Sequence, residues 1–166
     1  MPATAAVPNG WQKTLKAGDV GHDLLPMNAR QLAVARALPG KNELIWETQP
    51  VPANAREQAT FTVTWEGGMG YFAEPAAAFT LHVNDEKLLD LSALSEQSTV
   101  WLTADKTASL KYERDPSRFE MGLLTLSLPS ARVTPGQPLR LKVTAPASNS
   151  RRWFGVCETC SEPRSP

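Results

Sequence analysis

The 166-residue sequence has few cysteines, few histidines and no excess of charge of either sign. Its 17 basic and 17 acidic side chains leave no surplus cations to neutralise a phosphate backbone, so no nucleic-acid partner is expected. No apolar run approaches the roughly 18 residues of a membrane-spanning helix, so no membrane partner is expected either. The hydrophobic fraction of 42% indicates one globular domain with a substantial core.

The two cysteines, Cys157 and Cys160, form one CETC motif near the end of the sequence. A zinc site of the ribbon type requires a second pair of ligands, whereas the two histidines, His22 and His82, each stand alone. A redox CxxC normally opens a helix after a strand, and this pair is followed by SEPRSP instead. We therefore interpret the two cysteines as structural or tail residues.

Most segments between the 14 prolines and 10 glycines alternate apolar and polar residues with a period of two. This alternation predicts strands with one dry and one wet face, and turn signals at 38–43, 83–85 and 134–138 separate them. The expected fold class is all-β, an antiparallel β-sandwich of the jelly-roll type with little helix. Strands are predicted at 43–48, 60–65, 79–84, 99–103, 109–113, 123–128, 139–144 and 151–156.

Two stretches fit more than one secondary structure. Residues 28–38, NARQLAVARAL, favour a strand preceded by a short helical turn, and residues 88–97, LLDLSALSEQ, favour another helical turn. The predicted organisation is an N-terminal arm (1–27), a β-sandwich domain (28–156) and a C-terminal tail (157–166).

The stretch WEGGMGYFAEP (65–75) concentrates aromatic residues and glycines. Phosphate-binding glycine motifs lead into a helix, whereas Pro75 and another strand follow here, which excludes a dinucleotide or Walker site. We expect a loop between two strands, with Trp65 turned into the core and Tyr71 or Phe72 turned out.

Nucleophilic hydrolysis is not expected, because no GxSxG motif occurs and two isolated histidines provide little choice of base. The remaining catalytic interpretation is a pair of carboxylates. Glycosidases use two carboxylates about 5–10 Å apart. The loop and strand-end acids that qualify are Glu66, Glu74, Asp85, Asp90, Glu113 and Asp115, and the sequence selects no pair among them.

The position of each remaining aromatic residue within its alternating strand predicts whether its side chain lies on the dry or the wet face. Trp46 shares the face of Leu44 and is expected in the core, whereas Trp101 alternates with Val100 and Leu102 and is expected on the wet face. Exposed rings beside acids suit a neutral hydroxylated ligand, since the C–H face of a pyranose stacks on an aromatic ring. The predicted ligand-binding residues are Tyr71, Phe72, Glu74, Trp101 and Tyr112. Alternatively, these rings close the ends of the sandwich and contact no ligand.

The run FTVTWEGGMGYFAEP, followed by FTLHVNDEKLLDL and by the ending SNSRRWFGV, resembles accessory β-sandwich domains of bacterial polysaccharide-degrading enzymes. The resemblance covers about residues 30–156. It implies a non-catalytic carbohydrate-binding module that binds a polysaccharide or oligosaccharide and is attached to a catalytic domain. No cofactor is implied, although many such modules hold a structural calcium, whose ligands no local motif identifies here.

The first ten residues, MPATAAVPNG, lack the cationic start and apolar segment of a signal peptide. The sequence is thus cytoplasmic or a domain of a longer secreted chain, and the resemblance favours an extracellular or periplasmic protein. Two alternatives to the binding module remain open. One is a structural or interaction domain packed on a catalytic domain, and the other is a glycoside-cleaving enzyme with paired carboxylates.

Overall fold

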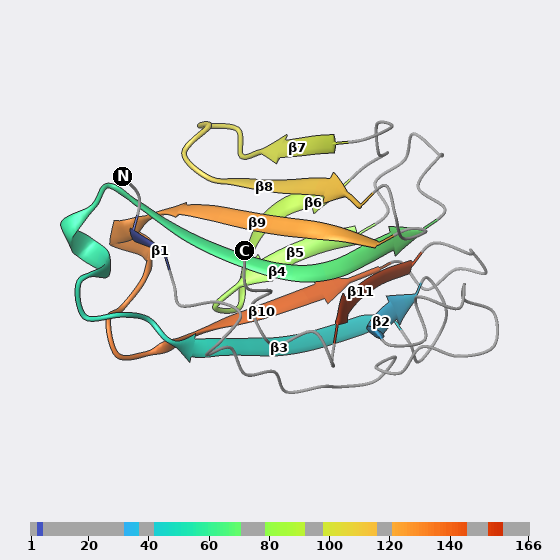
Figure 1. The fold of residues 1–166 in the computed structure, drawn as a ribbon, viewed down its shortest axis with the longest axis horizontal. Helices are drawn as coiled ribbons and strands as arrows, with labels where there is room; N and C mark the ends of the chain where they lie inside the picture. Colours follow the sequence, from blue (N-terminus) through green and yellow to red (C-terminus); the bar gives the residue numbers. More distant parts are fainter. Residues whose placement is uncertain are drawn as a thin grey trace.

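The computed structural model describes residues 3–4, 32–36, 42–70, 79–91, 98–115, 121–145 and 153–157. These residues form two β-sheets and two single-turn 3₁₀ helices, and none of their helices is long and apolar enough to cross a membrane (Figure 1). The strands are β1 (Ala3–Thr4), β2 (Leu32–Arg36), β3 (Glu43–Pro50), β4 (Thr60–Gly70), β5 (Phe79–Val83), β6 (Glu86–Leu91), β7 (Ser98–Leu102), β8 (Ser109–Arg114), β9 (Met121–Pro129), β10 (Pro138–Thr144) and β11 (Trp153–Cys157). The 3₁₀ helices are η2 (Ala55–Glu57) and η3 (Ser130–Arg132).

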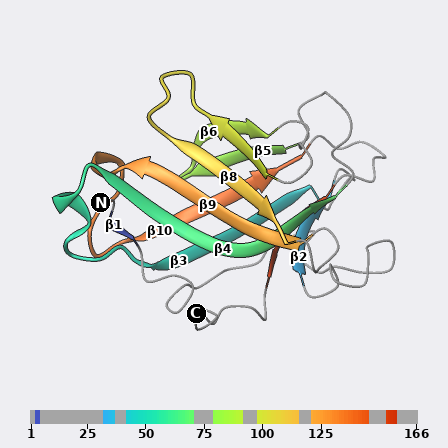
Figure 2. The same ribbon diagram turned by 45° about the horizontal axis from the view of Figure 1, so that its top comes forward.

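The seven-stranded sheet has the order β2-β11-β4-β9-β8-β7, with β1 also paired to β4, and the four-stranded sheet has the order β3-β10-β5-β6. All described pairings are antiparallel except the short parallel contact between β1 and β4. The two sheets lie one over the other in both views (Figures 1 and 2). The fold-class prediction, an all-β antiparallel sandwich with little helix, is confirmed.

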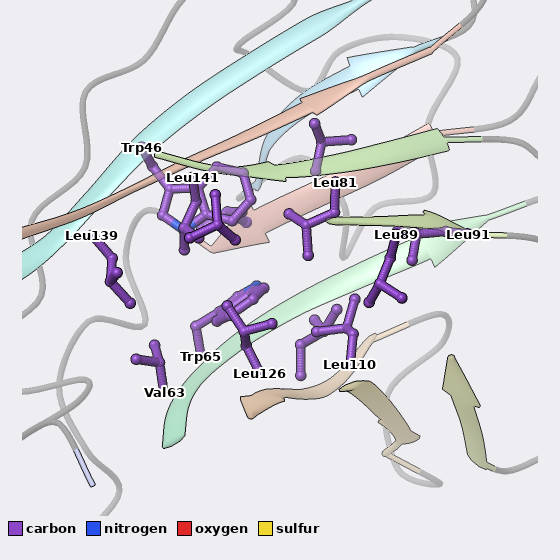
Figure 3. Packing of buried hydrophobic residues seen from close by; sticks show 14 of the residues in the cluster. Trp46, Val63, Trp65, Leu81, Leu89, Leu91, Leu110, Leu126, Leu139 and Leu141 are labelled. Carbon is purple, nitrogen blue, oxygen red and sulfur yellow. The ribbon is translucent and has the colours of Figure 1, made fainter. Parts of the chain in front are cut away.

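The core forms where the alternating apolar side chains of the two sheets meet (Figure 3). Strands β5 and β10 show the expected alternation, with every second side chain buried. Trp65 and Trp46 are both fully buried, as parity predicts. Burial of large side chains of this kind provides the main stabilisation of a sandwich, about 25 cal/mol per Å² of apolar surface.

The connections between strands divide regularly between the two ends of the sandwich. Those after β3, β5, β7 and β9 leave one end, where η2 and η3 lie, and those after β2, β4, β6, β8 and β10 leave the other end (Figure 1). At the first end Arg56 donates two hydrogen bonds to the Val133 carbonyl, at 3.1 and 2.9 Å, which joins the two 3₁₀ regions. Strand β4 ends at Gly70 at the second end, and β5 begins there at Phe79.

Two predicted turns are confirmed by their backbone geometry. Asn84 and Asp85 both have positive φ, 50° and 68°, which is the type I′ geometry that a two-residue hairpin between β5 and β6 requires. Gly136, which follows Pro135, has a φ of 86°. The Gln137 N–H donates to the Thr134 carbonyl at 3.0 Å, which closes the turn. The predicted turn at 38–43 lies mostly outside the described residues.

All eight predicted strands are present, and the strand interpretation of 28–38 is confirmed at β2. Within 88–97, where a helical turn is predicted, residues 88–91 belong to β6. The tight turn at Asn84 reverses the chain and places Leu89 and Leu91 in register with β5, where both are buried. Residues 92–97 lie outside the described residues.

The glycine-rich stretch begins as a strand and not as a loop. Strand β4 continues to Gly70, so the prediction of a loop starting after Trp65 is wrong for residues 66–70. Gly67 lies between β9 and β11, and a Cβ atom there would overlap the Gly155 carbonyl oxygen. The absence of a side chain therefore permits the close approach of β11.

The domain limits at 28 and 156 stay a prediction, because the residues that flank them lie mostly outside the described part of the chain. Strand β1 lies in the predicted arm but pairs with β4, through Ala3 opposite Phe61 and Thr4 opposite Thr62. Strand β11 ends at Cys157, one residue beyond the predicted domain end.

Candidate functional site

Trp101 is buried, not displayed on the wet face as parity with its threonine neighbours predicted. Its exposed fraction is 7%, whereas those of Val100 and Leu102 are 50% and 54%. Trp101 does alternate with Val100 and Leu102, but the face that carries Trp101 is the buried one. An indole removes more apolar surface from water than Val or Leu, so β7 turns the ring towards the core beside Leu110.

Tyr112 is also buried, with an exposed fraction of 1%, so its ring is not displayed to a ligand as predicted. The ring occupies space that Gly122 of β9 leaves open, since a Cβ on Gly122 would lie 2.6 Å from Tyr112 Cε1. The structure thus places Trp101 and Tyr112 in the core, where they support the seven-stranded sheet. Tyr71, Phe72 and Glu74 lie outside the described residues.

The outer face of the seven-stranded sheet carries regular rows of side chains across β4, β9 and β8. One row contains Glu66, Leu123 and Glu113, because Leu123 pairs with Glu66 on one side and with Glu113 on the other. The next row contains Thr64, Thr125 and Lys111. These rows combine carboxylates, hydroxyls, one ammonium group and one aliphatic side chain on a single face.

Glu66 and Glu113 are the acids that this register brings together. They lie two strands apart, which corresponds to about 10 Å between their backbones at the usual strand spacing. Leu123 between them is 40% exposed. Lys111 Nζ lies 3.3 Å from a Glu113 carboxylate oxygen in an ion pair whose side chains are about half exposed. Glu66 is half-buried, with its Oε2 atom fully buried, whereas Glu113 is exposed. Hydroxyl groups can therefore find an acceptor and a donor beside Leu123 at Glu113 and Lys111.

This row lies near the end of the sandwich from which the predicted ring loop departs. Glu66 precedes the last residue of β4, Gly70, by four positions, and Glu113 precedes the last residue of β8, Arg114, by one. The connection between β4 and β5 passes from one sheet to the other. Glu66 and the sequence Tyr71–Glu74 are thus neighbours along the chain.

The outer face of the four-stranded sheet carries a second polar group of residues centred on His82. Its neighbours across the sheet are Lys142 on β10 and Lys87 on β6, and His82 Nε2 lies 3.4 Å from Thr144 Oγ1. Partial burial lowers the pKa of His82 below its ordinary 6.5, and the positive charges of Lys142 and Lys87 lower it further. Neutral imidazole is favoured there.

Asp90 on the same face accepts two interactions that hold its carboxylate in place. Lys87 Nζ lies 2.8 Å from one oxygen, and Thr80 Oγ1 donates to the other at 3.0 Å. The hydrogen bond from Lys87 is the main reason that the pKa of Asp90 falls below its usual value. Asp90 and Asp85, candidates for a carboxylate pair with Glu66 or Glu113, lie on the opposite sheet from both.

The described residues contain no group of three or more His, Cys, Asp or Glu side chains able to hold a metal ion. Cys157 lies in β11 and Cys160 outside the described residues, so zinc binding by this pair is untested. Structural calcium stays a prediction of the resemblance.

Comparison of the chain with protein-family models, with curated proteins and with solved structures finds no match. The resemblance to accessory domains of polysaccharide-degrading enzymes therefore rests on the sequence pattern.

Sequence reasoning included Glu66 and Glu113 among six candidate acids but did not bring them together. Leu123, which lies between them, was missed altogether. Its signal was the alternation of β9, where Leu124, Leu126 and Leu128 face the core and Leu123 must face outwards. The pairing register of three strands was the missing information, and an isolated sequence does not contain it explicitly.

Proposed function

We propose that this chain is a non-catalytic carbohydrate-binding module that directs an attached or partner enzyme to a polysaccharide. The observation that carries the proposal is the Glu66–Leu123–Glu113 row on the outer face of the seven-stranded sheet. A sugar ring presents hydroxyl donors at its edge and C–H groups on its faces. This row offers carboxylate acceptors on both sides of an exposed aliphatic side chain.

In this arrangement the carboxylates of Glu66 and Glu113 accept hydrogen bonds from sugar hydroxyls. Lys111 donates to sugar oxygens, and Thr64 and Thr125 provide hydroxyls that can donate or accept. Leu123 contacts the C–H face of the ring and excludes water from the contact. Polar groups in successive rows along a sheet face suit an extended chain ligand more than a single small molecule.

The ring loop is the second part of the proposed site. Tyr71 and Phe72 follow Gly70 directly and are proposed to stack on an adjacent sugar, with Glu74 accepting hydroxyl protons. These three roles come from the sequence, in which Tyr71 to Glu74 follow directly after the end of β4 at Gly70. Trp101 and Tyr112 have no part in the proposed site because both rings are buried.

A glycoside-cleaving enzyme is the second candidate, since the same register places two glutamates on one face with their backbones about 10 Å apart. The site differs from a glycosidase cleft in its exposure. Glu113 is about half exposed and ion-paired with Lys111, whereas a general acid needs a site that favours its protonated form. We therefore place binding first.

The test is a glycan array with the purified chain, followed by incubation of each bound glycan and measurement of released sugar. The proposal expects binding to at least one polysaccharide class and no release. Release that disappears in Glu113→Gln would establish the enzyme instead. Binding to no glycan would favour the interaction-domain alternative, for which exposed Val100 and Leu102 offer an apolar contact surface. Localisation outside the cytoplasm is part of the proposal, because polysaccharide substrates lie there.

A further inference from the structure

Strand β7 forms an edge of the seven-stranded sheet, and among the described strands it pairs only with β8 (Figure 1). Its outward side chains, Val100 and Leu102, are 50% and 54% exposed. They account for two of the three exposed large hydrophobic side chains of the described residues, the third being Leu123 on β9. An apolar edge of this kind is a ready template for another strand.

At these same two residues the backbone of β7 directs its N–H and C=O groups away from β8, to the side on which no described strand pairs with it. The Thr103 N–H donates to the Ala108 carbonyl at 3.0 Å, so Thr103 directs its backbone groups towards β8. In an antiparallel pair the direction of the backbone N–H and C=O groups alternates along the strand. The backbone groups of Trp101 therefore also point towards β8, while those of Val100 and Leu102 point away from it. The open edge thus presents the N–H and C=O groups of Val100 and Leu102.

The edge strands of the other sheet carry the features that normally prevent such pairing. Strand β6 exposes Lys87 and Asp90, and its pairing with β5 contains an irregularity. Strand β3 carries Glu43 and Glu47 and ends at Pro50. Strand β7, with the sequence STVWL, has no charge, no proline and no irregularity in its pairing with β8. Strand β2, the other edge of the seven-stranded sheet, carries Arg36. Among the four edge strands β2, β3, β6 and β7, only β7 therefore has neither a charge nor a proline.

We infer that β7 is a homodimer interface, in which a second copy of the chain adds its own β7 antiparallel across a two-fold axis through Trp101. This register places Val100 opposite Leu102 of the second copy, and Leu102 opposite its Val100. Both pairs are of the hydrogen-bonded kind, because these residues direct their backbone groups to the open edge. The two seven-stranded sheets become one continuous sheet.

The second copy is favoured over other partners by the absence of charge along the strand. In a two-fold interface every charge near the axis meets its own copy, so a charged strand repels itself. From Ser98 to Ala104 the sequence STVWLTA contains no charged residue, and the apolar pair complements itself when the strand is reversed. The contact involves two short strands, so we expect dissociation in the micromolar range or weaker. This inference is independent of the proposed carbohydrate site, which lies on other strands.

Sedimentation velocity of the full chain over a concentration series tests the inference. A dimer is expected to form reversibly as the concentration rises. Val100→Lys and Leu102→Lys should each raise the dimer dissociation constant tenfold or more, since each substitution occurs twice in the dimer. Leu123→Lys is the matched control, because it makes the same change at an exposed residue of the same face but away from the edge, and it should leave the dimer intact. Circular dichroism checks that all three variants are folded.

Residue-resolved hydrogen exchange distinguishes strand addition from other forms of association. The amides of Val100 and Leu102 should become protected as the dimer forms, whereas the amide of Trp101 is protected by β8 at every concentration. A monomer at all concentrations would overturn the inference. So would a dimer that persists in Val100→Lys and Leu102→Lys, or one that leaves the amides of Val100 and Leu102 unprotected. Binding of β7 only to a separate catalytic domain, with no self-association, would also overturn it.

Discussion

The indole of Trp46 in the four-stranded sheet lies edge-on against the indole of Trp65 in the seven-stranded sheet. Their ring centroids are 5.6 Å apart and the ring planes make an angle of 68°. Phe154 of β11 also stacks with Trp46, with a centroid distance of 6.1 Å and an angle of 28° between the ring planes. This aromatic contact joins the sheets beneath the glycine-rich part of β4.

Trp65→Ala should lower the free energy of unfolding by roughly 3–5 kcal/mol, because it removes a fully buried indole from a close-packed core. Chemical denaturation measures the change. A double-mutant cycle with Trp46→Leu and Trp65→Leu, which removes the aromatic ring at each position, should show a coupling of about 0.5–1.5 kcal/mol from the edge-on contact. A loss below about 1 kcal/mol for Trp65→Ala would contradict the central position of this ring.

Gly122→Ala should destabilise the domain by roughly 1–3 kcal/mol, as other overpacking substitutions do. The new methyl group would overlap the Glu113 carbonyl and the ring of Tyr112, and neither can move without shifting β8. Thermal unfolding measures the effect. Ser127→Ala, an outward change on the same strand, should leave the melting temperature nearly unchanged. Equal melting temperatures for the two variants would show that the β8–β9 contact is looser than the structure indicates.

Gly67 and Gly122 illustrate the difference between the parts of the fold that the sequence predicts and the parts that it does not. The alternation of apolar residues identified eight strands and the fold class, because a period of two is a local property. The roles of Gly67 and Gly122 were not predictable, since each depends on what lies across the sheet: the Gly155 carbonyl in one case and the Tyr112 ring in the other. Glycine composition alone indicated a loop.

Trp101 illustrates a second limit of prediction from sequence. The sequence correctly predicts that Trp101 lies on the opposite face of the strand from Val100 and Leu102, but the polarity of neighbouring residues does not determine which face of an edge strand is buried. The answer depends on β8, where the partner Leu110 is fully buried. The candidate site has the same dependence, because only the registers of β4, β9 and β8 place Glu66 and Glu113 around Leu123.

The stability of the domain should decrease as the pH falls through the range just below 6.5, in part because of His82. Burial and the adjacent Lys142 and Lys87 lower its pKa in the folded state, whereas Glu43 and Asp85 oppose the shift weakly. In that range the unfolded chain binds more protons than the folded chain, so protonation favours unfolding. The contribution is fully present above 6.5 and is lost as the pH falls through the lowered pKa.

Urea denaturation at a series of pH values, with and without His82→Gln, measures this contribution. The wild-type chain should lose stability relative to the variant as the pH is lowered, and NMR titration of the His82 imidazole should give a pKa below 6.5. Parallel stability curves for the two proteins would contradict the effect.

Asp105 should stabilise the β7–β8 hairpin through its charge. Its carboxylate accepts hydrogen bonds from the Thr103 hydroxyl at 2.7 Å and from the Thr107 N–H and hydroxyl at 3.0 and 2.7 Å. The Thr107 N–H is the main cause of a pKa of about 2. The contribution is present above the ordinary 3.8 and is lost as the pH falls through about 2. Asp105→Asn should therefore melt earlier than the wild-type chain near neutral pH, and the difference should shrink in acid. A constant difference at all pH values would exclude the charge as its cause.

The central claim is that the Glu66–Leu123–Glu113 face binds carbohydrate. Isothermal titration calorimetry with the best glycan from the array tests it most directly, using Glu113→Gln, Leu123→Ala and Tyr71→Ala. Glu47→Gln on the opposite sheet is the matched control for the loss of one carboxylate charge. Each of the three site variants should bind about tenfold more weakly, a loss on the order of 1–2 kcal/mol, with an unchanged melting temperature. The control should bind like the wild-type chain. Unchanged affinity in both Glu113→Gln and Leu123→Ala would contradict the claim and place the ligand elsewhere.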